Sequence, residues 1–294
     1  MSRFQVIKGI PFSNVHWFKK ENIEGTIDYY PKDGDISIAS YPKTGTTWLQ
    51  YIVLQITSEG DYFPPFNDLH VKTFMEMAGP EVIDSLKGVR IYKHHYRYDM
   101  VKKNPKSKVL YIYRNPEDTF VSYFHFMENV REEKLNFEEF FEGFLSGNIE
   151  YGSYFEHVLS FLNHKDDDNL LLISYEKLHA NPREEILRIA RFLGEEYYQG
   201  LLSDELLLSK ILKNTSFEHM KKNLKFDLPH NSIEESSEKH ANNINLFRKG
   251  IIGDGKSLLF EKQMCRSREK FTEIMKDTEV FKEWIKQQNN LSTA

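Results

Sequence analysis

The chain has 294 residues, of which 40% are hydrophobic and 28% are charged, and this ordinary globular composition suits one large α/β domain or two small ones. A formal net charge of −5 argues against a general surface for nucleic acid or anionic membranes, so any anion site must be local. The single cysteine, Cys265, excludes an intrachain disulfide and a cysteine-rich zinc site and fits a reducing compartment.

The hydropathy pattern predicts a cytoplasmic protein. No run approaches the roughly 18 apolar residues that a membrane span needs, and the N-terminal stretch lacks the apolar region of a signal peptide. No group of His, Asp and Glu residues shows metal-ligand spacing, so we expect no metal. We likewise expect no nucleic-acid or membrane partner.

The first part of the chain predicts a phosphate-binding loop. Residues 1–33 are rich in Gly, Pro and Asn and predict an irregular N-terminal segment, and residues 35–39 then predict a buried strand. The YPKTGTT segment, residues 41–47, interrupts this pattern, and apolar residues return at helical spacing over residues 48–56. A strand, a small-residue loop with a lysine and a helix are typical of a phosphate site, because N–H groups at a helix N-terminus point at the anion.

This loop differs from a Walker A sequence, in which the lysine follows the last glycine. Lys43 precedes the only glycine, Gly45, and Pro42 precedes the lysine. We therefore expect a nucleotide loop that does not belong to an ordinary ATPase or GTPase. From this motif alone, a strand–turn–helix connection with an incidental lysine stays open as the alternative.

The remaining elements complete an α/β pattern. Strands are predicted over residues 89–93, 108–113 and 169–174, and helices over residues 116–127, 136–164 (two helices), 182–193, 203–222 and the C-terminal part. This alternation predicts one domain, residues 1–294, with a central, mostly parallel sheet flanked by helices. Residues 225–247 are polar and aperiodic, so we expect a mobile loop there. The aromatic, proline-broken loop of residues 62–66 is either a packed surface loop or a pocket wall.

Basic residues follow three of the predicted strands. Lys43 follows the first strand, Lys93 and two histidines end the second, and Arg114 follows the third. Because the carboxyl ends of parallel strands share one edge, these residues should meet in one crevice and suit an anionic ligand and a proton acceptor. His94 and His95 should point to opposite faces, and the strand pattern alone does not choose between them.

Several motifs carry a family resemblance. Residues 41–48, YPKTGTTW, match the pattern Y-P-K-[ST]-G-T-T-W, and residues 114–123, RNPEDTFVSY, match R-N-x-x-D-x-x-V-S-x. Residues 248–254, RKGIIGD, match the start of R-K-G-x-x-G-D-W-K, and residues 93–95 match K-x-H. With this order and spacing the chain resembles the cytosolic sulfotransferases, which move a sulfuryl group from 3′-phosphoadenosine 5′-phosphosulfate (PAPS) to a hydroxyl or amine.

The resemblance implies a P-loop-like phosphosulfate-binding loop, PAPS as co-substrate and no metal. It implies that His95 is the catalytic base and that Lys93 assists at the sulfuryl group. It assigns Lys43, Thr44, Gly45, Thr46 and Thr47 to the 5′-phosphosulfate, Arg114, Ser122, Arg248, Lys249 and Gly250 to the 3′-phosphate, and Trp48, Tyr175, Thr215 and Phe217 to the adenine.

The chemistry of sulfuryl transfer agrees with these assignments. By analogy with phosphoryl transfer, the transition state is loose and in line, so a lysine aimed at the leaving oxygen acts where charge builds up. A histidine with a pKa near ~6.5 can accept the acceptor's proton at neutral pH. The aromatic content suggests a small hydrophobic acceptor of the phenol, steroid or aliphatic alcohol class.

The chain departs from the family pattern in three places. Gly255 replaces the tryptophan of the late motif, which predicts a looser edge of the site. Tyr96 and Arg97 replace the common Leu-Pro on the acceptor side. The family's dimerisation motif, which would start at Lys256, is not matched, although a homodimer stays open.

Two other functions compete with this prediction. A catalytically inactive nucleotide- or lipophile-binding protein of the same fold would also carry these motifs, and the departures near Gly255 and Tyr96 motivate it. The position of Lys43 argues against a P-loop kinase or NTPase.

Overall fold

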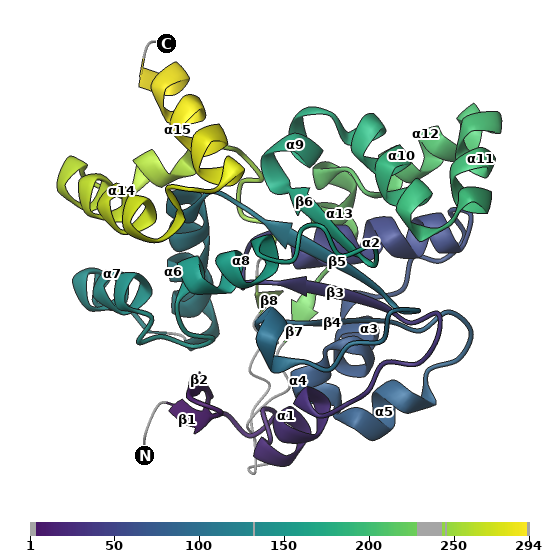
Figure 1. Cartoon of the computed structure of the whole chain (residues 1–294), viewed down its shortest axis with the longest axis horizontal. Helices are drawn as coiled ribbons and strands as arrows, with labels where there is room; N and C mark the ends of the chain where they lie inside the picture. Colours follow the sequence, from purple (N-terminus) through teal and green to yellow (C-terminus); the bar gives the residue numbers. More distant parts are fainter. Residues whose placement is uncertain (1–3, 132, 228–242, 245, 293–294) are drawn as a thin grey trace.

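The centre of the structure is a four-stranded parallel sheet with the strand order β4-β3-β5-β6 (Figure 1). The structure is a computed structural model, and it describes residues 4–131, 133–227, 243–244 and 246–292. Helices pack on both faces of the sheet, so the predicted α/β fold with a central parallel sheet is confirmed.

The strands are β1 (Phe4–Ile7), β2 (Ile10–Ser13), β3 (Ile36–Ser40), β4 (Ile91–His94), β5 (Lys108–Tyr113), β6 (Leu170–Ser174), β7 (Phe226–Asp227) and β8 (Asn243–Ile244). The first eight α-helices are α1 (Lys20–Ile27), α2 (Thr46–Thr57), α3 (Phe66–Thr73), α4 (Met75–Ala78), α5 (Pro80–Ser85), α6 (Pro116–Arg131), α7 (Phe137–Ser146) and α8 (Tyr154–Leu162). The later α-helices are α9 (Tyr175–Ala180), α10 (Pro182–Leu193), α11 (Glu195–Ser203), α12 (Glu205–Asn214), α13 (Phe217–Asn223), α14 (Glu261–Met275) and α15 (Glu279–Ser292). Two 3₁₀ segments, η1 (Tyr98–Met100) and η2 (Asp254–Ser257), complete the set.

The central strands are apolar on both faces, and each face has its own core. Ile38 and Leu110 point into a core that includes residues of α2, α10 and α12. Ala39 and Tyr111, one residue further along, point into a second core with residues of α1, α6, α7, α8 and α14. Period-two alternation thus divides each strand between two helical layers, as expected for a sheet buried on both sides.

The strand register places four loops at one edge. Ala39 of β3 pairs with His94 of β4 and with Tyr111 of β5, and Tyr113 pairs with Ser174 of β6. The four strands therefore end nearly level. The residues that follow them, including Tyr41, His95, Arg114 and Tyr175, begin the loops and helices at the carboxyl edge, where ligands bind in open α/β sheets.

The main differences from the predicted elements lie outside the sheet. Residues 1–33 were expected to be irregular, but the chain forms an antiparallel hairpin of β1 and β2 followed by α1. Three short helices, α3 to α5, follow the aromatic loop. Of the expected mobile loop at residues 225–247, residues 228–242 and 245 lie outside the described part.

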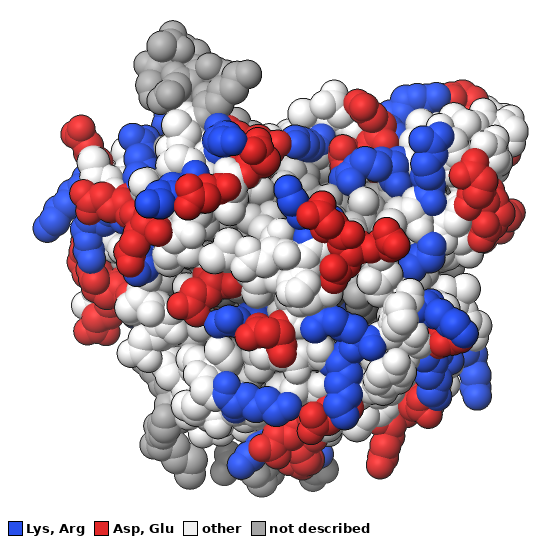
Figure 2. Space-filling view, viewed as in Figure 1, with Lys and Arg blue, Asp and Glu red and all other residues white. Residues whose placement is uncertain are grey.

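The described surface is mixed in charge on the face that Figure 2 shows, where acidic and basic side chains intermingle. Across the described ranges, no helix combines the length and apolar character required to cross a bilayer.

Candidate active site

A cavity of about 560 Å³ opens at the carboxyl edge of the sheet. Every predicted site residue except Thr44 lines it, so the structure brings together motifs that lie far apart in the chain. The cavity runs between a polar region around Arg114 and Arg248 and an aromatic region around Phe66 and Phe74. One ligand-sized space is thus shared by a candidate anion site and a candidate apolar site.

The loop after β3 is tightly folded. Lys43 has a positive φ of 71° and Gly45 a φ of 112°. A Cβ atom on Gly45 would lie 2.9 Å from Ile112 Cδ1 and 3.0 Å from Tyr175 Cδ2, so only glycine fits between these side chains. The loop can therefore pack closely against both β5 and the start of α9, and these elements form one wall of the site.

The N-terminus of α2 is available to an anion. Gly45 is its N-cap, and the described residues supply neither a side-chain cap nor an acidic residue in its first turn. The Thr44 hydroxyl donates to the carbonyls of Tyr41 (2.8 Å) and Ile112 (3.0 Å), so it stabilises the loop, and only its backbone remains for a ligand. First-turn N–H groups without a protein partner are a ready anion site.

Three cations converge on this loop. The pKa of Lys43 falls to about 7, chiefly because the ammonium is buried and then because Arg114 and Arg248 repel it. Its Nζ lies 4.0 Å from the centre of the Phe126 ring, which is a cation–π contact. A bound dianion would remove this repulsion, so the charge arrangement favours a multiply charged anionic ligand.

Arg114, at the end of β5, is buried and already oriented. Its guanidinium stacks over the Tyr175 ring at 4.4 Å and donates to the Ile251 carbonyl at 2.9 Å. Its buried Nε has no hydrogen-bond partner among the described residues. A buried guanidinium with an unused donor beside the cavity is suited to bind a phosphate oxygen.

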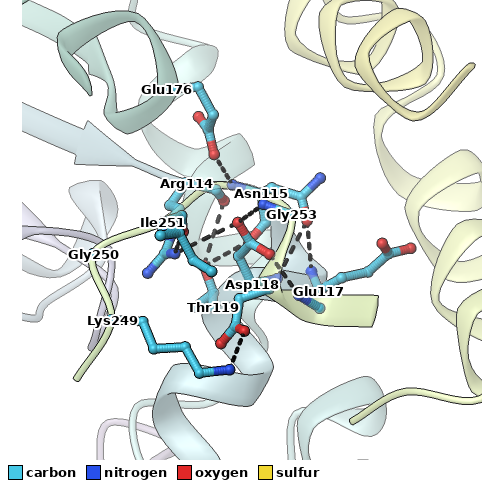
Figure 3. Close-up of polar contacts among 12 residues, drawn as sticks. Arg114, Asn115, Glu117, Asp118, Thr119, Glu176, Lys249, Gly250, Ile251 and Gly253 are labelled. Carbon is cyan, nitrogen blue, oxygen red and sulfur yellow. Dashed lines mark hydrogen bonds and ion pairs between the residues drawn. The ribbon is translucent and has the colours of Figure 1, made fainter. Parts of the chain in front are cut away.

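Asp118 holds the basic, glycine-rich segment of residues 248–256 at the site. Its carboxylate accepts hydrogen bonds from the backbone N–H groups of Gly253 (2.9 Å) and Gly255 (2.7 Å). Figure 3 shows Asp118 of α6 beside Gly253 of this segment. Asp254 in turn pairs with both Arg248 and Lys249, the latter at 2.7 Å. Burial alone would raise the pKa of Asp254, but the hydrogen bonds from Lys249 and Arg248 lower it overall.

Gly255 packs more closely than the sequence predicted. In place of the looser edge expected from the missing tryptophan, the residue is buried, and a Cβ atom there would lie 2.6 Å from Glu117 Cβ. The prediction was therefore wrong at this point. The absent side chain lets the segment lie directly on the first turn of α6.

An aromatic wall closes the polar end of the cavity. The Trp48 and Tyr175 rings meet edge to face at 5.4 Å, and the indole N–H of Trp48 donates to the Thr215 carbonyl at 2.9 Å. Gly250 has a φ of 66°, and a Cβ atom there would lie 2.3 Å from the Phe217 ring. These contacts leave aromatic faces and edges beside the cations, as a purine base requires.

His95 has a fixed tautomer. Its Nδ1 lies 2.8 Å from the Ser40 carbonyl oxygen, which can only accept, so Nδ1 carries the proton and Nε2 keeps its lone pair. The pKa of His95 falls to about 3, chiefly because of burial, with repulsion from Lys93 as a further cause. The ring is therefore neutral at physiological pH, with one nitrogen able to accept a proton.

His94 takes the other face of β4, as the strand pattern predicted. It is buried away from the site cavity, and its Nδ1 accepts the Tyr96 backbone N–H at 3.2 Å. Only His95 of the two histidines lines the cavity. The geometry thus selects His95 as the residue that can meet a ligand.

Lys93 and Glu76 form a buried titratable pair beside His95. Burial lowers the pKa of Lys93 to about 7 and raises that of Glu76 to about 8, and each group partly offsets the shift of the other. One Glu76 oxygen accepts the His95 backbone N–H at 2.6 Å. Lys93 also lies over the Phe66 ring, 4.9 Å from its centre.

The far end of the cavity is largely apolar. It is lined by Val15, Trp17, Phe18, Phe66, His70, Phe74, Met77, Phe126, Met127, Val130, Tyr151 and Phe226. Phe66 ends the proline-broken loop, so this end of the loop is a pocket wall, whereas Tyr62 is exposed. The space beside His95 suits a hydrophobic molecule.

Sequence reasoning did not identify Ser40, Glu76, His157, Asp118 or Asp254 as site residues. The signals for Asp118 and Asp254 were available, because both stand inside the matched motifs. Ser40, Glu76 and His157 had no such signal, since they reach His95 through the tertiary fold. In the described part of the chain, no group of three or more His, Cys, Asp or Glu residues could hold a metal ion.

Comparisons with known proteins agree with this site. A family model of the sulfotransferase domain matches residues 33–284. Sulfotransferase 1B1 of Canis lupus familiaris is 35% identical over 286 residues, covering 92% of this chain and 91% of that protein. Sulfotransferase 2A1 of Macaca fascicularis is 34% identical over 284 residues, covering 93% and 95%. The chain therefore belongs to the sulfotransferase family, and it is a sulfotransferase.

Solved structures show the same fold. Mouse sulfotransferase SULT7A1 complexed with PAP superposes with a TM-score of 0.76 at 28% identity, covering 96% of this chain and 98% of that chain. Retinol dehydratase in complex with retinol and PAP gives a TM-score of 0.69 at 22% identity, covering 92% and 89%, and shows the fold alone. The sequence-predicted family is thus confirmed.

Proposed function

We propose that the chain transfers a sulfuryl group from PAPS to a hydroxyl or amine of a small hydrophobic acceptor, with His95 as base and in-line geometry. The observation that carries the proposal is the position of Lys43, Lys93 and His95 on one continuous cavity between the cationic and the aromatic ends. A donor at one end and an acceptor at the other would meet beside His95. The PAP bound to the mouse relative supports the choice of donor.

The cationic end is proposed to bind the nucleotide. Lys43 and the backbone of residues 44–47 would hold the 5′-phosphosulfate at the N-terminus of α2. Arg114, Ser122 and the 248–250 segment would hold the 3′-phosphate, and Trp48, Tyr175, Thr215 and Phe217 would enclose the adenine. When the donor is bound, its phosphosulfate supplies the activated sulfuryl group.

Charge development explains the proposed roles of the two lysines. As the S–O bond to the nucleotide breaks, negative charge accumulates on the leaving phosphate oxygen. Lys43 would stabilise that charge, and Lys93 would stabilise the oxygens of the transferring group. Both lysines have a lowered pKa in the free protein because they are buried, and an anionic donor would keep them protonated.

His95 is proposed to take the acceptor's proton through Nε2. The hydrogen bond from Nδ1 to Ser40 holds the ring in the required tautomer, and the resulting imidazolium would lie near the departing negative charge. Aromatic side chains such as Phe66, Phe74 and Tyr151 would hold the acceptor and exclude water. The name of a guinea-pig relative, 3-alpha-hydroxysteroid sulfotransferase, which is 35% identical over 262 residues, supports a hydrophobic alcohol.

Transfer of a radioactive sulfuryl group from ³⁵S-labelled PAPS to a panel of phenols, steroids, aliphatic alcohols and amines tests this function. We expect labelled product with at least one hydrophobic acceptor and no requirement for added metal. Binding of PAP without turnover of any acceptor would instead support an inactive nucleotide-binding protein. Sulfation that His95→Ala leaves unchanged would exclude His95 as the base.

We also propose that the chain acts as one sulfotransferase domain in the cytoplasm. The span of the family model and the shared central sheet support a single domain. A cooperative thermal transition with one calorimetric peak, and recovery of the protein in the cytosolic fraction of its source cells, are the expected results.

A further inference from the structure

His95 lies just beyond the paired part of β4. The ladder between β3 and β4 ends at the pair of Ala39 and His94. The peptide groups of His95 therefore need partners other than the sheet, because a half-buried residue at a site wall cannot leave them unpaired without cost. Two buried side chains from distant elements supply these partners.

Glu76 holds the N–H side of His95. This residue of α4 is fully buried, and its Oε1 accepts the His95 backbone N–H at 2.6 Å. The chain just before α4 runs along β4, where Phe74 forms a parallel bridge with Lys93. Asn22 of α1 donates to the Met77 carbonyl at 2.7 Å and so fixes α4 from its other side.

His157 holds the carbonyl side. Its Nε2 lies 3.1 Å from the His95 carbonyl oxygen, and its Nδ1 lies 2.9 Å from the Tyr111 hydroxyl. Because a carbonyl only accepts, Nε2 must carry the proton, Nδ1 must be the acceptor, and the tyrosine must donate. Burial lowers the pKa of His157 to about 3, which keeps this directed chain neutral.

We propose that Glu76 and His157 are positioning residues for His95 and that Tyr111 orients the His157 ring for this purpose. The inference rests on the proposed function, in which His95 Nε2 accepts the acceptor's proton. With its N–H held by α4, its carbonyl by α8 and its ring by Ser40, His95 has little freedom to rotate away from the sulfuryl group. Small displacements matter here, because an error of 1 Å in the position of a catalytic group can cost about 100-fold in rate.

Two pairs of variants test the proposal with little change in volume. Tyr111→Phe removes the hydroxyl that orients His157, and Tyr92→Phe is its matched control. Tyr92 is equally buried on β4, which β3 separates from β5, and its hydroxyl donates to Asp35 at 3.3 Å, away from this chain of hydrogen bonds. Glu76→Met removes the acceptor for the His95 N–H, whereas Glu76→Gln keeps an oxygen there.

With PAPS and the best acceptor found for the parent chain, we expect kcat to fall about 10-fold in Tyr111→Phe and about 100-fold in Glu76→Met, with the KM for PAPS unchanged. Glu76→Gln should recover most of the loss in Glu76→Met, and Tyr92→Phe should stay within about twofold of the parent. The proposal is overturned if Tyr111→Phe and Glu76→Met have the same kcat as Tyr92→Phe. It is also overturned if these two variants change only the KM.

Amide exchange separates this proposal from the proposed function. If the parent sulfates no acceptor, the function fails, but the hold on His95 can still be measured by hydrogen exchange of a peptide covering residues 91–98. Faster exchange in Glu76→Met and Tyr111→Phe than in Tyr92→Phe supports the hold. Equal exchange in all three variants overturns it, whatever the activity.

Discussion

His95 and Ser40 are joined by a hydrogen bond of 2.8 Å between Nδ1 and the Ser40 carbonyl. The Ser40 hydroxyl lies 2.6 Å from that of Thr46, the first residue of α2. One residue at the end of β3 thus contacts both the candidate base and the candidate phosphosulfate loop. The distance between His95 and the loop proposed to bind the phosphosulfate is therefore set by β3, which belongs to the central sheet.

The adjacent histidines give the first prediction. His95→Asn retains an N–H group that can reach the Ser40 carbonyl but has no basic nitrogen, so kcat should fall by about 10²–10⁴ while PAP binding stays near that of the parent. His94→Asn keeps an acceptor for the Tyr96 N–H and should retain the parent's kcat within about threefold. Steady-state kinetics and calorimetric titration with PAP measure both. Equal losses in the two variants would contradict the assignment.

The second prediction concerns pH. Lys43 and Lys93 each have a pKa near 7 in the free protein because they are buried, so both are largely neutral above that pH. An anionic nucleotide favours the ammonium forms, and binding must then take up protons. The affinity for PAP should consequently fall as pH rises, by at least about tenfold between pH 7 and pH 9.

Titration calorimetry in two buffers of different ionisation enthalpy measures this proton uptake directly. Lys43→Met removes one of the two groups, so fewer protons should be taken up at pH 8. A dissociation constant that is the same at pH 7.5 and pH 9, with no proton uptake, would show that the lysines are already charged in the free protein.

The parts of this site that the sequence predicted are local ones. Lys43 and Arg114 stand in loops directly after apolar strands, and the carboxyl edge of a parallel sheet brings such loops together. Glu76 and His157 could not be predicted in the same way, because their contacts with His95 depend on how α4 and α8 pack. The hairpin of β1 and β2 was missed although Lys8 and Gly9, both with positive φ, form a two-residue turn of the kind that hairpins favour.

The third prediction separates activity from stability at Lys43. Burial, and then repulsion from Arg114 and Arg248, lower the pKa of Lys43 to about 7. Its charged form therefore destabilises the free protein, and this cost is fully present at and below pH 7 and falls as the pH rises above it. Lys43→Met should raise the free energy of unfolding by about 1 kcal/mol, which corresponds to a rise of a few degrees in Tm. The same variant should lower kcat by about 10²–10³-fold. The backbone at position 43 has the same positive φ in the parent and in Lys43→Met, so the difference in Tm between them reflects the charge of the lysine.

Lys106→Met is the control for this comparison. Lys106 is exposed and pairs with Asp33 at 2.9 Å on the surface, so its loss should leave kcat unchanged and give no gain in Tm. A Tm of Lys43→Met below that of the parent would mean that the lysine stabilises the loop, contrary to the electrostatic argument.

The fourth prediction concerns the glycine that replaces the family tryptophan. A Cβ atom on Gly255 would lie 2.6 Å from Glu117 Cβ and 3.1 Å from the Glu117 carbonyl carbon, and the Gly255 N–H donates to Asp118. Gly255→Ala must push the segment away from α6, so the free energy of unfolding should fall by about 1–3 kcal/mol. The same shift moves Arg248 and Lys249, which should weaken PAP binding.

Gly200→Ala is the matched control, because Gly200 lies within α11 and its added Cβ would meet no atom within 4 Å. Alanine is the better helix former, so this variant should be stabilised by about 0.5–1 kcal/mol without a change in PAP affinity. Chemical denaturation and PAP titration of both variants decide the point. If Gly255→Ala binds PAP as tightly as Gly200→Ala, then the contact between Gly255 and α6 does not set the position of Arg248 and Lys249.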